Sequence, residues 1–107
     1  MALHLNGKAA LAEAIKAAGD KLIVIDFFAT WCGPCRVISP VIDKMVTEYS
    51  DVTFIKIDVD ENEAVAEEYG ISVMPTFIFL KKGAKLGEMT GANEATLKTN
   101  VEKYRTQ

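Results

Sequence analysis

The chain has 107 residues, of which half are apolar and a quarter are charged. This length fits one domain, and the apolar content is enough to bury a core, which excludes an intrinsically disordered protein. No stretch approaches the ~20 consecutive apolar residues that a membrane helix needs. The 12 basic and 15 acidic residues give a net charge of -3, without the basic footprint of a nucleic-acid-binding protein. We therefore predict a single domain over residues 1–107, with no membrane span and no nucleic-acid partner.

Residues 8–18 predict a short amphipathic helix, because their apolar positions follow helical spacing and Gly19 suits the end of a helix. Glu13 and Lys16 interrupt the unbroken apolar run that a secretory signal would need. The sequence therefore favours a cytoplasmic protein, in a compartment that keeps thiols reduced.

Residues 22–29 form an apolar run rich in β-branched and aromatic side chains, which predicts a strand buried on both faces. A helix is predicted over 34–49, with Pro34 at its start and a kink at Pro40. The apolar positions of this helix, at helical spacing, are Val37, Ile38, Val41, Ile42, Met45 and Val46.

The remaining sequence predicts further strands and helices in alternation, followed by a hairpin around Lys82-Gly83. The predicted elements are a strand at 52–58, a helix at 62–69, strands at 76–81 and 84–90, a helix at 93–105 capped by Asn93, and a short additional strand at 3–5. This order implies an α/β protein, a three-layer α/β/α sandwich. Its central, mostly parallel sheet would have four to five strands and an antiparallel C-terminal hairpin.

The only two cysteines, Cys32 and Cys35, lie where the first buried strand gives way to the helix starting at Pro34. A pair with this spacing can bind metal, form a structural disulfide or cycle between dithiol and disulfide. A closed zinc site needs four ligands, and the chain adds one histidine, His4, so we predict no metal site. A structural bridge across so short a loop would stabilise the fold little. The pattern favours redox cycling.

The reactive form of a cysteine is the thiolate, and a helix N-terminus stabilises it. Cys32 lies just ahead of the predicted helix, so we expect it to attack, while Cys35, one turn inside and more buried, resolves. Pro34 would fix the turn, and Gly33 would let a substrate backbone approach closely. Asp26, an acid inside an apolar strand, should have a raised pKa. The residues alone leave open whether it is a structural acid or a proton acceptor.

The run Asp26-Phe27-Phe28-Ala29-Thr30-Trp31-Cys32-Gly33-Pro34-Cys35 stands 38 residues before Met74-Pro75-Thr76, and Gly91-Ala92 follows. These motifs, with the element order and the length, resemble the thioredoxin family over essentially the whole chain. The resemblance implies the thioredoxin fold and a monomeric protein-disulfide reductase with a redox-active Cys32–Cys35 disulfide and no bound cofactor. An NADPH-dependent thioredoxin reductase would supply electrons. Targets would be disulfide-containing proteins such as peroxiredoxins, ribonucleotide reductase and methionine sulfoxide reductase.

The resemblance also implies roles for further residues. Asp26 would relay a proton to Cys35, and Lys56 would lie near that acid. The Met74-Pro75 bond would be cis and would lie beside the cysteines, so that the backbone at residue 74 could pair with an extended substrate. The expected docking surface consists of Trp31, Gly33, Pro34, Met74, Pro75, Gly91 and Ala92.

Two other functions fit the same motif. An oxidase or isomerase is one, but such relatives usually carry a histidine between the cysteines, where this chain has Gly33-Pro34. The other is a binding subunit that keeps the fold for protein contacts, which an intact cysteine pair does not exclude.

Overall fold

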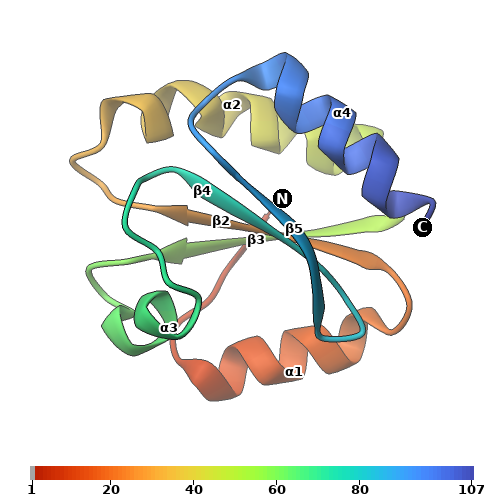
Figure 1. Cartoon of the computed structure of the whole chain (residues 1–107), viewed down its shortest axis with the longest axis horizontal. Coiled ribbons are helices and arrows are strands. Elements are labelled where there is room, and N and C mark those ends of the chain that lie inside the picture. The colour runs from red at the N-terminus through yellow and green to blue at the C-terminus, as the bar shows by residue number, and fades with distance from the viewer. Residues whose placement is uncertain (1) are drawn as a thin grey trace.

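The computed structural model describes residues 2–107, which form five strands and four helices (Figure 1). In chain order they are β1 (Leu3–His4), α1 (Lys8–Ala18), β2 (Leu22–Phe28), α2 (Gly33–Glu48), β3 (Val52–Asp58), α3 (Glu63–Glu68), β4 (Thr76–Lys81), β5 (Ala84–Thr90) and α4 (Glu94–Arg105). Every predicted element is present, and its ends lie within one residue of the predicted ones. None of these helices is long and apolar enough to cross a membrane.

The strands form one sheet in the order β1-β3-β2-β4-β5, with helices on both faces, which confirms the predicted sandwich (Figure 1). The pairings β1–β3 and β2–β3 are parallel, whereas β2–β4 and β4–β5 are antiparallel, so the sheet is evenly mixed and not mostly parallel as predicted. The connection that contains α3 returns the chain to the end of the sheet at which it leaves β3, so β4 runs antiparallel to β2.

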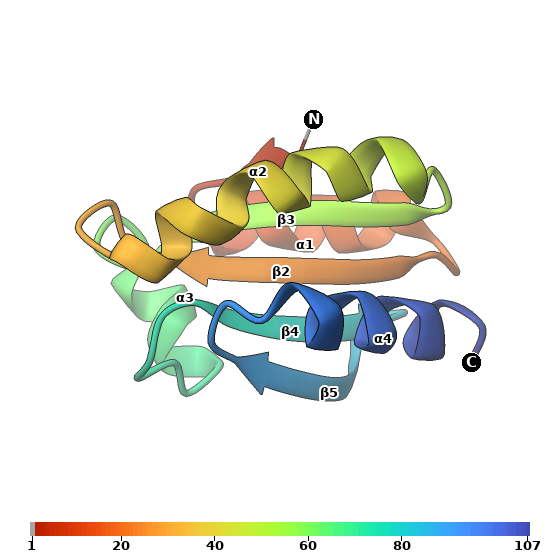
Figure 2. The same cartoon turned by 90° about the horizontal axis from the view of Figure 1, so that it is seen from above.

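Alternate residues of the strands belong to two separate cores, one on each face of the sheet. Figure 2 shows α2 and α4 in front of the sheet, and α1 behind it. On one face, Leu22 and Val24 pack with side chains of α2 and α4. On the other face, Ile23, Ile25 and Phe27 pack with side chains of α1 and α3. Because both faces are covered, β2 is buried along its length except at Phe28. This explains why its sequence is a continuous apolar run interrupted only by Asp26.

Four segments meet at one edge of the sheet. Phe28, which ends β2, pairs with Asp58, which ends β3. Thr76, which begins β4, pairs with Thr90, which ends β5. The loops after β2, β3 and β5 and the segment before β4 therefore lie together, although the ends of β2 and β5 are 62 positions apart in the sequence. This edge holds both cysteines.

Candidate active site

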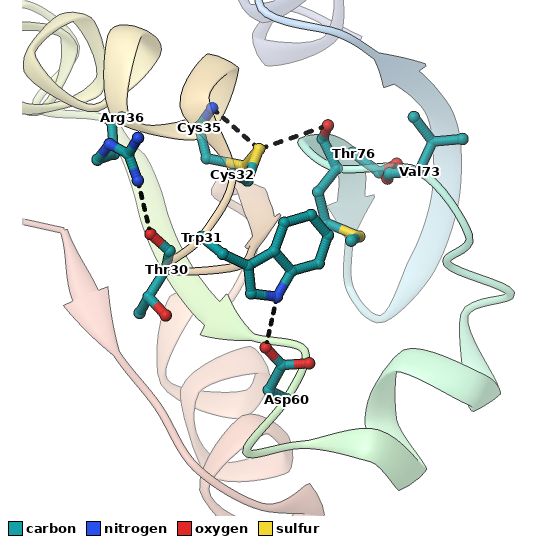
Figure 3. Close-up of a disulfide and its surroundings, with 9 residues drawn as sticks. Thr30, Trp31, Cys32, Cys35, Arg36, Asp60, Val73 and Thr76 are labelled. Atoms are coloured by element: carbon teal, nitrogen blue, oxygen red, sulfur yellow. Dashed lines mark hydrogen bonds between the residues drawn. A yellow bond between two sulfur atoms is a disulfide. The ribbon is translucent and has the colours of Figure 1, made fainter.

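Cys32 and Cys35 form a disulfide at the start of α2, with Cα atoms 5.3 Å apart (Figure 3). Cys32 is the N-cap of the helix, and its Sγ accepts a hydrogen bond from the backbone N–H of Cys35 at 3.1 Å. The two residues are almost equally buried, 5% and 4% exposed, so burial does not distinguish them as expected. Their positions in the helix distinguish them, because Cys32 caps α2 while Cys35 lies inside its first turn. Between them, Gly33 is half-buried and Pro34 is exposed.

The segment before β4 lies against the disulfide. The Met74-Pro75 peptide bond is cis, and Cys32 Sγ lies 3.7 Å from the carbonyl oxygen of Met74 (Figure 3). The backbone N–H of Gly91 donates to the carbonyl of Pro75 at 2.9 Å, which joins the end of β5 to this segment. Ala92 follows, half-buried against the core of the α2 and α4 face. The structure thus brings these predicted docking residues together around Cys32.

Trp31 is exposed by 65%, and its indole N–H donates to Asp60 Oδ2 at 2.9 Å (Figure 3). Asp60 lies in the loop after β3, and no local sequence signal marks it as a partner of Trp31. Val73, beside Met74, is 53% exposed. Val37, on α2, is 71% exposed, although it belongs to the apolar positions at helical spacing and its neighbour Ile38 is buried.

Asp26 lies on the α2 face of β2, is only 3% exposed and stands opposite Lys56 of β3 in the parallel register. Its Oδ1 is buried and has no hydrogen-bond partner among the described residues. Burial raises the pKa of Asp26 to about 7, and the positive charge of Lys56 partly opposes this rise. A carboxyl with this pKa can take or release a proton near neutral pH.

Lys56 is 8% exposed, and its ammonium group donates a hydrogen bond to the hydroxyl of Ser39 on α2. A cavity of about 470 Å³ is lined by Asp26, Cys35, Ser39 and Lys56 together with His4 and other residues. His4 pairs with Lys56 in the register of β1 and β3. The cavity thus connects the buried acid with the inner cysteine. Sequence reasoning did not identify Ser39.

The described residues contain no cluster of three or more His, Cys, Asp or Glu side chains that could hold a metal ion. The reactive groups at this edge are the cysteine pair and the acid that lines the same cavity as Cys35. A dithiol that closes a disulfide across the first turn of a helix, at the strand ends of an α/β sandwich, defines a thiol-disulfide oxidoreductase.

Comparison with known proteins identifies the particular family. The family model described as Thioredoxin matches residues 3–103. Human thioredoxin is 48% identical over 101 residues, covering 94% of this chain and 96% of the relative. The structure of Fasciola hepatica thioredoxin superposes with a TM-score of 0.93 at 42% identity, covering 94% of this chain and 97% of the other.

A solved structure concerned with thiol resolution in the yeast mitochondrial 1-Cys peroxiredoxin through glutathione/thioredoxin systems also matches. Its TM-score is 0.88 at 36% identity, covering 95% of this chain and 94% of the other. The chain belongs to the thioredoxin family. It is a protein-disulfide oxidoreductase with a redox-active Cys32–Cys35 pair.

Proposed function

We propose that this chain, as a single domain and a monomer, reduces disulfides in other proteins. The carrying observation is the position of Cys32, whose sulfur caps α2, faces the Met74 carbonyl and is surrounded by exposed apolar side chains. A helix N-terminus stabilises a thiolate through its dipole and its unpaired N–H groups. Cys32 is thus the nucleophile of the reduced protein, since only the thiolate attacks a disulfide.

The docking surface around Cys32 accepts an extended segment of the target. Trp31 provides an exposed aromatic face (Figure 3). The carbonyl oxygen of Met74 lies 3.7 Å from Cys32 Sγ. The other parts of this surface are Gly33, Pro34, Pro75, Gly91 and Ala92. Backbone pairing at Met74 would align a target disulfide with Cys32 without selecting particular target side chains.

Reduction then proceeds in two exchanges. The Cys32 thiolate attacks one target sulfur, forming a mixed disulfide, while the other target sulfur leaves and takes a proton. Cys35 then loses its proton and attacks Cys32 Sγ, which restores the Cys32–Cys35 disulfide and releases the second target sulfur as a thiolate that takes a proton from water. Two electrons pass to the target in each turn. Asp26 accepts the Cys35 proton across the cavity that both residues line, and Lys56 moderates the basicity of that acid.

An NADPH-dependent thioredoxin reductase would return two electrons to the disulfide, so the chain needs no bound cofactor of its own. The targets are disulfide-containing proteins of the cytoplasm. Peroxiredoxins are one such class, and the similar structure concerned with a yeast peroxiredoxin supports this choice. Ribonucleotide reductase and methionine sulfoxide reductase are two further targets. All three are reduced by the same pair of exchanges.

Insulin reduction tests this function. With dithiothreitol as electron donor, the protein should speed the precipitation of reduced insulin, and Cys32→Ser should reduce the rate to the uncatalysed background. Cys35→Ser retains the attacking thiolate, so it should accumulate a mixed disulfide with the target, visible by mass spectrometry. If the unmodified chain and Cys32→Ser precipitate insulin equally slowly, the protein is a binding subunit rather than a reductase.

The direction of electron flow needs a separate measurement. Equilibration with glutathione redox buffers should show a Cys32–Cys35 pair that is still oxidised where an oxidase pair would already be reduced, because a stronger reductant has a lower reduction potential. A pair that is readily reduced by glutathione, together with rapid oxidation of a reduced substrate protein, would instead identify an oxidase or isomerase.

A further inference from the structure

The contact between Ser39 and Lys56 joins α2 to the sheet directly above the buried acid. Ser39 is half-buried on the same helix that carries Cys35, and its hydroxyl oxygen accepts from the Lys56 ammonium. Lys56 as a residue is only 8% exposed, and its charge therefore needs a hydrogen-bond partner, because an unpaired buried charge is costly. Ser39 provides one without adding a charge.

Lys56 and Asp26 stand opposite each other on neighbouring strands, a position in which oppositely charged side chains commonly pair. Within residues 2–107, however, no ion pair joins them, and Asp26 Oδ1 has no hydrogen-bond partner. The ammonium is bonded to the helix instead of to the carboxylate. The serine and the acid therefore compete for one lysine.

We propose that Ser39 is a positioning residue whose hydroxyl holds the Lys56 ammonium away from Asp26 and so keeps this acid free of an ion pair. The proposal rests on the role given above to Asp26 in the exchange. A carboxylate in a close ion pair is a weaker base, since the neighbouring positive charge favours its charged form. By keeping the lysine bonded to α2, Ser39 lets the acid accept a proton from Cys35 near neutral pH.

The other charged and titratable groups around Asp26 are less able than Lys56 to form an ion pair with it. His4 of β1 lies one strand farther away, and its side chain is exposed. On α2, Arg36 donates to the carbonyl of Thr30, and Asp43 is exposed at the wall of the cavity. On the β4 side, the register partner of Asp26 is the uncharged Phe77. Lys56 is thus the charge that can approach Asp26 most closely.

The test measures the pKa of Asp26 directly, from the carboxyl carbon chemical shift in a pH titration of the oxidised, full-length protein. Ser39→Ala removes the hydroxyl, so Lys56 turns to Asp26 and the pKa of Asp26 falls by about 1 or more. An unchanged pKa, a raised pKa, or transfer of the ammonium to Asp43 overturns the proposal. Ser39→Thr keeps a hydroxyl at this position and should keep the pKa of the unmodified protein.

A second background separates positioning from a general disturbance of the helix. In Lys56→Met, the substitution Ser39→Ala should no longer change the pKa of Asp26, because no ammonium remains to move. A fall of equal size in this background also overturns the proposal. These titrations report on the acid whether or not it acts in catalysis. Suppose that the pKa of Asp26 changes as expected while Ser39→Ala leaves the pH dependence of mixed-disulfide resolution unchanged. The proton relay from Cys35 to Asp26 is then contradicted, and the positioning role of Ser39 is supported.

Discussion

Two adjacent residues of β2, Ile25 and Asp26, occupy contrasting environments on opposite faces of one sheet. Ile25 pairs in register with Ile55 on one side and Ile78 on the other, and all three are fully buried. Their face packs against α1 and α3 in an apolar cluster. This side of the strand contributes only to stability, because its side chains remove apolar surface from water.

On the opposite face, the residues in register with Asp26 include a charged one, and Asp26 Oδ1 has no hydrogen-bond partner among the described residues. Asp26 pairs with Lys56 on one side and Phe77 on the other, and it lines a cavity of about 470 Å³ together with residues of α2. An acid that has no partner at one oxygen destabilises the fold when it ionises. The comparison teaches that one strand both stabilises the fold and carries the buried acid, because its alternate residues face different helices.

The largest predicted effect is on stability, for Asp26→Asn. The unfolded chain releases this proton near pH 3.8, whereas the folded chain keeps it to about pH 7. The folded state therefore binds more protons between these values, and its free energy of unfolding falls as pH rises through the window. Above it, the loss is about 4 kcal/mol. Asp26→Asn should recover this amount at pH of about 8 and almost nothing at about 4, measured by urea unfolding of the oxidised protein. Equal gains at both pH values would contradict the burial of an ionising acid.

Ile25→Ala is the matched change on the apolar face. Loss of a buried isoleucine side chain leaves a cavity and should lower the free energy of unfolding by about 3 kcal/mol. No titrating group is removed, so the loss should be the same at pH of about 4 and about 8 in the same urea experiment. A loss that varied with pH would show that the two faces are coupled through β2.

The third prediction concerns the rate of exchange. Asp26→Asn should slow the resolution of the mixed disulfide on the order of 100-fold and its formation much less, because the first exchange uses a thiolate that already exists. Stopped-flow tryptophan fluorescence, with Trp31 beside the sulfur, can follow both steps. Ile25→Ala, measured at a temperature where it is folded, should change neither step. Equal slowing of both steps by Asp26→Asn would contradict a proton relay between Cys35 and Asp26.

The sequence predicted much of this arrangement and missed the parts that depend on tertiary contacts. The alternation of strands and helices gave every element, and the motif around Cys32 and Cys35 indicated the exchange chemistry. The partners of Trp31 and Lys56 were not predictable from the sequence. Asp60 lies 29 positions after Trp31, Ser39 lies 17 positions before Lys56, and both are ordinary polar residues. Only the strand register and the placement of α2 over the sheet bring them together.

The smallest predicted effect concerns an exposed acid near the apolar face. Glu68, at the end of α3, forms an ion pair with Lys8 of α1 at 3.6 Å, and both side chains are more than half exposed. Glu68→Gln should lower the free energy of unfolding by less than about 1 kcal/mol, because water and salt screen such pairs. Urea unfolding at low and high salt measures this loss, which should vanish at high salt. A paired acid in water thus changes the free energy of unfolding less than an unpaired acid in the core. The large effect expected for Asp26 comes from its burial and not from pairing. A loss comparable to the gain in Asp26→Asn would contradict this ranking.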